Sequence, residues 1–357
     1  MNDYKKKNQN EKVSDFRQSL ANMFINLLEE KPTTWKKEWS VTSPFNPITN
    51  TRYKGVNRFV LQLTQMKKGY SDPRWVTFVQ IADKDKKYHP KQEWKLKKGA
   101  KATEIMYAYP FNIEEKKAYT WEEYNLAIIN NESKDSDFKI CQRFSNVFNA
   151  SMVEGIEPYK EPVNHDEEIC VDELITTLSK NMVVPIVHGG NRACYIPSLD
   201  EIHLPPIEAF TSNNSYNSTA LHELAHSTGA EKRLNRNIHN IFGSSDYAFE
   251  ELVAEISACF MSESLQIPEN PKIAENHKAY VQGWVKELKD KPEALIKAVN
   301  EAQKVADYMD YQAGIITVKE YSKHKDSQIT VNDDTGEILP NKKQAKNKPK
   351  KREAEER

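Results

Sequence analysis

Apolar side chains recur every three or four residues near the start of the chain, at positions such as Phe16, Leu20 and Phe24. This spacing predicts an amphipathic helix over residues 13–31, because positions three and four apart share one helix face. Pro32 ends that helix, since proline lacks the amide hydrogen that the next turn needs. The chain therefore begins with a helix that buries one face.

After this helix, short apolar runs alternate with turn-forming residues. The pattern predicts short strands and loops, one further helix over 55–68 and a strand over 102–109. Residues 112–140 are polar and acidic, which favours a loop or a helical excursion, and residues 144–156 return to the pattern of a strand. A polar, proline-bearing linker follows at 157–168.

Helical periodicity returns in the second half of the chain. It predicts a helix over 169–181, strands over 183–188 and 193–204, and helices from about residue 218 onward. A helical pattern also dominates residues 271–309. Together, the two halves predict an α+β protein.

We expect two domains, because 357 residues exceed the roughly 100–200 residues of a typical single domain. The first domain is predicted to be a small mixed α/β unit over 13–156, and the linker 157–168 joins it to a second domain over 169–322. Residues 323–357 are charged and poor in aromatic side chains. Such a composition cannot bury a core, so we expect a disordered tail.

Charge is distributed unevenly over these parts, although the whole chain has a formal net charge of −1. Residues 1–110 carry a net charge of +11, residues 111–322 carry −15, and the tail carries +3. The near-neutral total therefore does not exclude a nucleic-acid ligand. It combines a basic N-terminal part with an acidic second part.

Composition excludes several classes of protein. No stretch approaches the ~18 consecutive apolar residues of a membrane span, and the first residues lack the apolar core of a signal peptide. We therefore expect a cytoplasmic protein that does not bind a membrane. Four cysteines, Cys141, Cys170, Cys194 and Cys259, are too far apart for a metal knuckle. We expect them to be reduced and mostly buried.

The second half contains the sequence His222-Glu223-Leu224-Ala225-His226 within a helical pattern. Two histidines four residues apart lie on one helix face, where both imidazoles can bind one Zn²⁺. The intervening Glu223 then reaches a water on the metal and acts as general base. The motif predicts a zinc peptidase, although a chance match on a soluble helix remains the alternative.

A catalytic zinc takes three protein ligands, and the segment 249–256 offers carboxylates for the third. Glu251 and Glu255 lie one turn apart, beside a predicted buried stripe that includes Leu252 and Ile256. We assign Glu251 as the third ligand and Glu255 as the group that holds a ligating histidine by its other ring nitrogen. The reverse assignment stays open, as does an exposed acidic helix without a metal.

The residues after the motif exclude one other zinc pattern. In the longer motif a third histidine follows six residues after His226, and here that position holds Lys232. Gly229 is accordingly interpreted as the end cap of the motif helix. No group that stabilises the transition state can be assigned among Tyr216, Arg233, His239 and Tyr247. His203 and His239 are interpreted as structural histidines. The predicted strands before the motif suggest an edge on which an extended peptide could pair.

The basic N-terminal part mixes lysine and arginine with aromatic residues. Single-strand binders need this mixture, because bases stack on aromatic rings while cations follow the phosphates. Aromatic side chains in a small domain are also core material, so we expect about half of them to be buried and silent. The candidate contacts to single-stranded DNA are Trp35, Arg52, Tyr53, Lys54, Asn57, Arg58, Arg74, Trp75, Lys97 and Lys98.

Several phrases resemble a known family. The N-terminal phrases NPITNTRYKGVN (46–57), SDPRWVTF (71–78), KKG (97–99) and VFN (147–149) are similar to the N-terminal domain of ArdC-type antirestriction proteins, which also occurs in TraC-type plasmid primases. The phrases HELAHSTG (222–229) and FEELVAEISA (249–258) are similar to the zincin-like metallopeptidase domain of these proteins. The chain departs from the family at Asn50, where glycine is common, and at Ser227, where an aromatic residue is usual.

This resemblance implies a domain that binds single-stranded DNA, joined to a metallopeptidase-like domain with Zn²⁺ or another divalent metal such as Mn²⁺. It implies a protein of a mobile element that protects incoming DNA from host restriction. We hypothesise that a DNA-associated host protein is the substrate. Two alternatives stay open: a metal-stabilised DNA-binding protein without catalysis, and a cytoplasmic protease or toxin without a DNA function.

Overall fold

The computed structural model describes residues 9–32, 42–160, 171–238, 244–265, 277–327, 330–331 and 338–339 of the 357-residue chain. Contacts divide the chain into two compact units. The first unit combines residues 1–108 with 142–325, and the second combines 109–141 with 326–357. The first unit thus contains most of both predicted domains, whose boundaries stay a prediction.

Two helices form the N-terminal core of the first unit. Helix α1 (Gln9–Glu30) covers the predicted helix, and α2 (Gly55–Lys68) has the predicted bounds. The helices are in contact, and the rings of Phe24 and Phe59 pack edge to face with centroids 5.2 Å apart. Both rings are fully buried, so the apolar face of α1 packs inside the protein.

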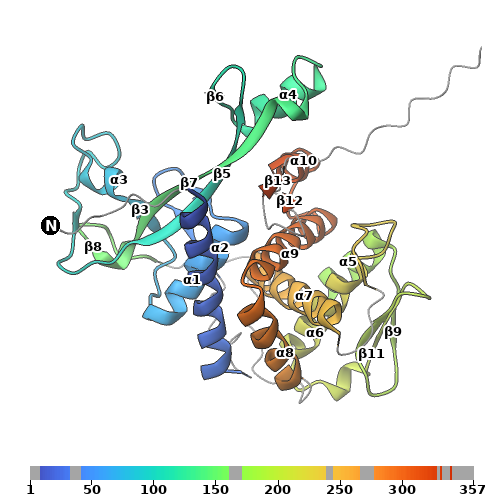
Figure 1. The fold of residues 1–357 in the computed structure, drawn as a ribbon. Coiled ribbons are helices and arrows are strands. Elements are labelled where there is room, and N and C mark those ends of the chain that lie inside the picture. Colours follow the sequence, from blue (N-terminus) through green and yellow to red (C-terminus); the bar gives the residue numbers. More distant parts are fainter. Residues whose placement is uncertain are drawn as a thin grey trace, which may run out of the picture. The chain divides into compact units, whose positions relative to one another are not determined.

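A four-stranded sheet lies next along the chain, with the order β3-β7-β5-β6 (Figure 1). Its strands are β3 (Trp75–Thr77), β5 (Thr103–Asn112), β6 (Lys117–Ala118) and β7 (Phe138–Asn149). Strand β3 pairs with β7 in antiparallel orientation, with Trp75 opposite Asn149. The long strands β5 and β7 each have residues in both units.

Smaller elements flank β3. They are the paired strands β1 (Phe45–Asn46) and β2 (Thr51–Arg52), the short helix α3 (Phe78–Ala82), and the paired strands β4 (Lys95–Leu96) and β8 (Val153–Glu154). The turn between β1 and β2 contains Asn50 with φ 53°, the left-handed conformation in which asparagine replaces glycine at little cost. A 3₁₀ turn, η3 (Ala150–Met152), precedes β8.

The second unit contains β6, helix α4 (Trp121–Ile129) and the 3₁₀ turn η2 (Asp135–Asp137). Thr120 and Glu123 form a capping box at the start of α4, which explains why this acidic segment becomes helical. The described part of this unit also includes the antiparallel strands β12 (Thr330–Val331) and β13 (Ile338–Leu339). These strands, with the end of α10 (Val318–Ser327), are what the structure describes of the tail 323–357.

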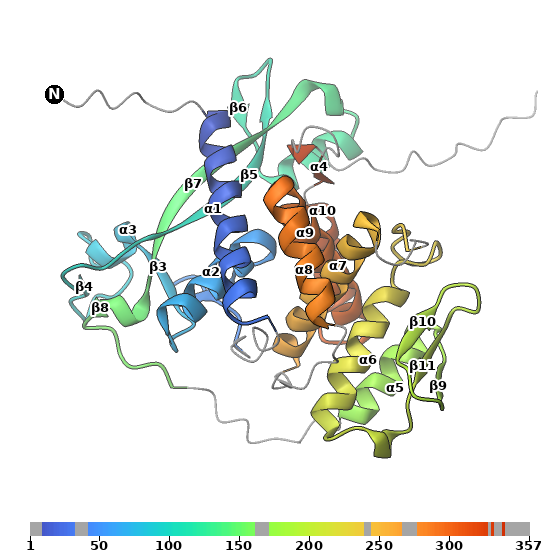
Figure 2. The ribbon, with the colours of Figure 1, turned by 60° about the horizontal axis from the view of Figure 1, so that its bottom comes forward.

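The remaining part of the first unit contains a small sheet and a set of helices (Figure 2). The sheet order is β10-β11-β9, with β9 (Ile186–His188), β10 (Cys194–Ile196) and β11 (Glu201–Leu204). The other elements are α5 (Val171–Met182), η4 (Ile207–Ala209), α6 (Asn213–Ser227), α7 (Ser245–Ser264), α8 (His277–Asp290) and α9 (Glu293–Gln312). Strand β10 is antiparallel to β11, with Tyr195 opposite Ile202, and it forms one edge of this sheet.

Helix α7 packs against α6, α8 and α9, so it is buried on nearly every side. The predicted stripe of Leu252, Ile256 and Phe260 is buried as expected. Four carboxylates of α7 are buried as well: Glu250, Glu251, Glu255 and Glu263. A buried carboxylate is costly without a partner, so each of these groups needs a cation or donor nearby.

Polar contacts join α2 to α7 and α9. The guanidinium of Arg58 pairs with Glu263 and donates to the carbonyl oxygen of Phe260 at 2.8 Å. The amide of Gly55 donates to the side chain of Gln303 at 2.8 Å, and Lys54 Nζ lies 3.1 Å from Asp307 Oδ1. The two halves of the first unit are therefore held together by specific charge pairs as well as by apolar packing.

Cys259 is buried and Cys141 and Cys194 are half-buried, and none of the three forms a disulfide with another described residue. Cys170 lies outside the described residues. Among the helices that the structure describes, none is long and apolar enough to cross a membrane.

Candidate metal centre

Helices α6 and α7 place the predicted metal ligands. Ser212 caps α6 through its side chain, which accepts from the amide of Ser215, so the helix begins earlier than the predicted residue 218. His222 and His226 follow on one face of α6. Glu251 lies on α7, which packs against α6. Sequence-distant groups are thus brought to one point by helix packing.

The three side chains converge through specific atoms. The Nε2 atoms of His222 and His226 are 3.1 Å apart, and the Glu251 carboxylate lies 3.6 Å from the first and 3.5 Å from the second. A tetrahedral metal with ligand bonds of about 2.0–2.2 Å separates its ligands by about 3.3–3.6 Å. Both histidine–carboxylate distances lie in this range, and the distance between the two Nε2 atoms is slightly shorter. This geometry favours Glu251 as the third ligand, while metal binding itself stays a prediction.

Two further carboxylates of α7 face the outer nitrogens of these histidines. Glu255 Oε2 lies 3.8 Å from Nδ1 of His222, in the place predicted for it. Glu250 Oε1 lies 3.3 Å from Nδ1 of His226, a contact that the sequence analysis missed. The spacing of Glu250 and His226 gave no periodic signal, because the two residues lie on different helices.

Electrostatics within the cluster match a cation site. Burial by itself lowers the pKa of His222, but the carboxylates of Glu255, Glu251 and Glu223 raise it to about 9. Burial raises the pKa of Glu251, and hydrogen bonding and charge from the two histidines outweigh this and hold that pKa below its ordinary value. Glu251 therefore remains ionised and attracts positive charge to this point.

Glu223 is only 7 % exposed and faces the edge strand β10. Its Oε2 accepts a hydrogen bond of 2.8 Å from the backbone amide of Tyr195. This bond fixes one carboxylate oxygen and ties the candidate base to the edge of the sheet. It also places the candidate base where a strand paired with β10 would pass.

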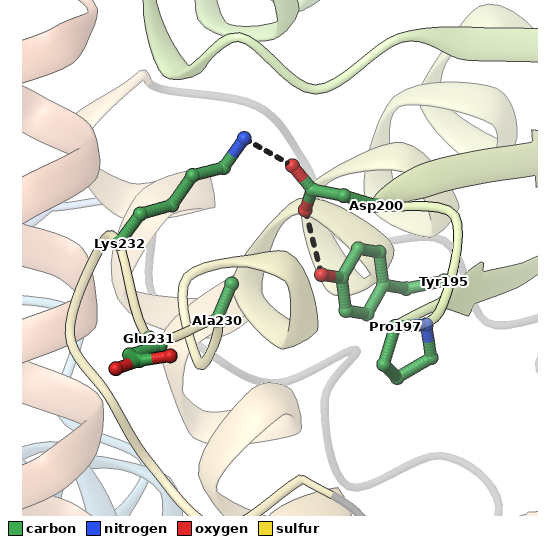
Figure 3. A pocket seen from close by; sticks show the side chains of 6 residues that line it. All are labelled: Tyr195, Pro197, Asp200, Ala230, Glu231 and Lys232. Carbon is green, nitrogen blue, oxygen red and sulfur yellow. Dashed lines mark hydrogen bonds and ion pairs between the residues drawn. The ribbon is translucent and has the colours of Figure 1, made fainter.

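A cavity of about 500 Å³ adjoins this edge strand. Its lining residues are Tyr195, Pro197, Asp200, Ala230, Glu231 and Lys232 (Figure 3). Asp200 accepts from the Tyr195 hydroxyl at 2.7 Å and pairs with Lys232 at 2.6 Å. Burial raises the pKa of Asp200, but hydrogen bonds from Arg233, Lys232 and Tyr195 hold it well below its usual range.

The structure separates the candidate transition-state groups. Arg233 is buried against Asp200 and donates to the carbonyl oxygen of Ser227, so its charge is neutralised by Asp200. Tyr216 is buried, and its hydroxyl lies 3.1 Å from His188 Nε2. Tyr247 donates a hydrogen bond to Glu251 and so touches the proposed ligand set.

The two predicted structural histidines also differ. His203 lies 3.3 Å from the Glu201 carboxylate on the small sheet. His239 lies outside the described residues. Of the candidate transition-state groups that the structure describes, Tyr247 is the one in contact with the proposed ligand Glu251.

The interpretation of Gly229 as the helix cap is wrong. Helix α6 ends at Ser227 with Thr228 as its cap in the right-handed conformation, and Gly229 has no left-handed backbone. A Cβ at Gly229 would lie 2.3 Å from the side chain of Ile238. Gly229 is thus required by close packing of the returning loop and not by a left-handed cap.

The predicted DNA contacts fall into different environments. Arg58 is 4 % exposed and paired with Glu263, and Trp75 is fully buried on β3. Asn57 accepts from and donates to the backbone of Met106, and Lys54 pairs with Asp307. Arg58, Trp75 and Asn57 therefore face protein, because α2 and β3 pack inside the unit, whereas Lys54 is paired but exposed.

The other predicted contacts lie nearer the surface. Arg52, Lys97 and Lys98 are exposed, and Tyr53 is half-buried. Arg74 is half-buried and donates to both carboxylate oxygens of Asp72. Trp35 lies outside the described residues.

Sequence reasoning missed two exposed apolar residues on α3. Phe78 is 59 % exposed and Val79 is 70 % exposed. Thr77 caps α3 through a capping box with Gln80, so the chain turns after β3 and Phe78 points to solvent. The Thr77 to Gln80 spacing is the local signal that could have indicated this turn.

Comparison with known proteins divides the chain in the same order. Residues 14–148 match the family described as the N-terminal domain of anti-restriction factor ArdC, and residues 173–301 match the zincin-like metallopeptidase family. Two DNA primases TraC from Escherichia coli are 32 % and 33 % identical over 82 % of this chain. The chain covers only 27 % and 20 % of the length of these primases.

Two solved structures are also similar. The crystal structure of the antirestriction ArdC protein from plasmid R388 is 26 % identical in its metal-free form, with a TM-score of 0.64, and it covers 85 % of this chain and 99 % of its own. The Mn(II)-bound form is 28 % identical, with a TM-score of 0.63 and coverages of 84 % and 99 %. These comparisons confirm the resemblance and the α+β fold with two matched domains.

Proposed function

We propose that this chain, which has the two-domain organisation of ArdC-type antirestriction proteins, protects incoming DNA of a mobile element from host restriction. One observation carries the proposal: three converging metal ligands and a carboxylate base occur in a chain whose N-terminal part matches the ArdC domain. The ArdC protein is the relevant relative, because the match covers nearly its whole length. We place this action in the cytoplasm, where incoming DNA meets restriction enzymes.

We propose that His222, His226 and Glu251 bind one divalent metal. The two imidazoles favour Zn²⁺, since nitrogen ligands suit zinc and oxygen ligands suit manganese. The Mn(II)-bound ArdC structure supports manganese as the other candidate. Metal analysis of the purified protein, with the His222→Ala variant beside it, distinguishes these ions.

For the chemistry, we propose hydrolysis of a peptide bond in a DNA-associated protein. A divalent metal in this site supplies Lewis acidity, which polarises a carbonyl group and lowers the pKa of water. Glu223 accepts a proton from the attacking water, using the carboxylate oxygen that Tyr195 does not bind. The edge of β10 beside Glu223 would hold an extended peptide by strand pairing.

We further propose that single-stranded DNA binds across the elements that flank β3. Strand β1 and helix α3 both contact β3, and α3 also contacts β4. These elements, strand β2 paired with β1, and the turn after β4 carry Arg52, Phe78, Lys97 and Lys98 at the surface. Phe78 supplies a ring for base stacking, and the three cations follow the phosphates. Arg58 and Trp75 are left out of this surface because both are buried.

Antirestriction is tested by transferring unmodified plasmid DNA into a restricting host that expresses the protein. We expect wild-type protein to raise plasmid recovery and Glu223→Gln to lose this effect while still binding metal. The His222→Ala variant should lose both protection and metal. Full protection by Glu223→Gln would contradict peptide hydrolysis.

Binding of single-stranded DNA is tested by a gel shift with labelled DNA at several salt concentrations. Phe78→Ala should weaken binding by about 1–3 kcal/mol, the value of one stacked base. Leu126→Ala is the matched control, because Leu126 is similarly exposed but lies on α4. Equal binding by both variants would remove Phe78 from the surface, and absence of salt dependence would argue against phosphate contacts.

A second candidate function is DNA binding by a protein that the metal only stabilises. The pairing of Arg58 with Glu263 favours it, because α7 carries both this contact to α2 and the ligand Glu251. In this case Glu223→Gln keeps protection and His222→Ala loses it. The two variants therefore separate catalysis from stabilisation.

A further inference from the structure

Arg236 lies in the loop after α6 and reaches back to the motif helix and to α7. It donates to Glu250 through Nε at 3.2 Å and through Nη2 at 2.6 Å. It also donates to Thr228 Oγ1 at 2.6 Å and to the carbonyl oxygen of Ala225 at 3.0 Å. Both charged side chains are buried, with exposures of 7 % for Arg236 and 8 % for Glu250.

The same Glu250 oxygen that accepts from Nη2 of Arg236 lies 3.3 Å from Nδ1 of His226. One carboxylate is thus shared by a guanidinium and an imidazole. A hydrogen on Nδ1 then points to Glu250, and the lone pair of Nε2 points to His222 and Glu251. This is the tautomer that a metal ligand needs.

We propose that Arg236 and Glu250 are positioning residues for the metal: they hold His226 in its metal-binding tautomer and orientation. This inference rests on the proposed metal site and deepens it. Arg236 fixes the orientation of Glu250, because its guanidinium donates to both oxygens of that carboxylate. The pair acts through His226 and touches neither substrate nor metal.

The loop geometry supports this role. The amide of Arg236 donates to the carbonyl oxygen of Gly229 at 2.9 Å, so the loop closes directly against the end of α6. A Cβ at Gly229 would lie 2.3 Å from the side chain of Ile238, which follows Arg236 in the same loop. The glycine after the motif therefore makes room for the loop that delivers Arg236.

The chain offers a matched control on the same helix. Arg58 of α2 and Glu263 of α7 form another buried arginine–carboxylate pair. The contacts of this pair in the described part of the chain include no histidine. Removing a charge there should affect stability alone. Removing a charge at Glu250 should affect metal affinity as well, because His226 loses its partner.

The test measures Zn²⁺ affinity of the full-length protein by competition with a chromophoric chelator, and the visible absorption of the Co²⁺-loaded protein. Glu250→Ala and Arg236→Gln should bind Zn²⁺ about 10–100-fold more weakly than wild type and alter the Co²⁺ spectrum. Glu263→Gln should keep wild-type affinity and spectrum even where its melting temperature falls. Circular dichroism of the metal-free variants verifies folding.

Should Arg236→Gln fail to fold, Arg236→Lys keeps the charge but loses the two-pronged contact, and we expect an intermediate loss of affinity. Wild-type affinity and spectrum in folded Glu250→Ala and Arg236→Lys would overturn the inference alone. Failure of the wild-type protein to bind any divalent metal would instead overturn the proposed metal site.

Discussion

Both ends of helix α7 bury carboxylates, and different partners stabilise these carboxylates at each end. Near its start, Glu250, Glu251 and Glu255 are buried around two histidines and one arginine. Near its end, Glu263 is buried against Arg58 and accepts from Gln62 at 2.9 Å. The second arrangement balances one negative charge with one permanent positive charge. In the contacts given for the described residues, the first brings three carboxylates together with one arginine, Arg236.

This difference indicates what each end is for. A self-balanced pair needs no further partner and serves to join α2 to α7. A cluster with excess negative charge is stabilised by protons on its histidines or by a divalent cation. Burial and acidic residues are common to both ends, so the convergent histidines distinguish the end at which we propose a metal site.

The comparison is tested most strongly by breaking the self-balanced end. Arg58→Ala should lower the free energy of unfolding by about 3–5 kcal/mol, because Glu263 then becomes an uncompensated buried charge. Urea denaturation measures this loss. Lys289→Ala is the control, since Lys289 and its partner Glu29 are both exposed and their pair should contribute less than about 1 kcal/mol. A change in metal affinity in Arg58→Ala would contradict the separation of the two ends.

Removing a ligand tests the metal end. His222→Ala should weaken metal binding by on the order of 3 kcal/mol or more, because a total of about 10–16 kcal/mol is shared among a few ligands in zinc sites. Isothermal titration with Zn²⁺ gives the value. Near-wild-type affinity would show that the ion binds elsewhere, and His203→Ala serves as the control outside the cluster.

The pH dependence of the metal-free protein gives a further test of the metal end. The pKa of His222 is raised to about 9, so its protonated form stabilises the fold. This stabilisation is complete below the ordinary histidine pKa of about 6.5 and is lost as pH rises to about 9, with at most about 3 kcal/mol at stake. His222→Gln should remove this part of the pH dependence. Unfolding measured at pH 6 and pH 9 in both proteins tests the prediction.

The smallest effect concerns the loop that delivers Arg236. Gly229→Ala should lower stability by about 1–3 kcal/mol, because the added methyl group overpacks against Ile238. Ile238→Ala in the same chain should recover part of this loss by making room. Thermal unfolding of the single and double variants measures the coupling, and an absence of recovery would place the strain elsewhere.

Local patterns predicted much of the metal end. The spacing of His222 and His226 follows from helix geometry, and Glu251 follows from the ExxxE pattern on the next helix. Arg236 and Glu250 carried no such signal, because their contact depends on how a loop folds back over α6. A sequence pattern of this kind shows which residues share an element, and it does not show which elements meet.

The N-terminal part illustrates the same limit. The bounds of α2 follow from the pattern, but the burial of Arg58 depends on α7, which is about two hundred residues away. Trp75 and Phe78 lie close together in sequence, yet one is core and the other is surface. The capping box at Thr77 turns the chain, so that Phe78 faces solvent while Trp75, a predicted DNA contact, is buried. Charge and aromatic content therefore indicated a binding unit without identifying its outward face.

The contact between Arg58 and Glu263 bears on how the two halves of the chain are exchanged between related proteins. Matches to the TraC primases extend over both halves of this chain, so the two domains recur as one cassette inside much longer proteins. An arginine on one half and its carboxylate on the other make the halves mutually dependent. Chimaeras between relatives should therefore remain soluble when both residues are exchanged together, and truncation at the linker would expose a buried charge on each fragment.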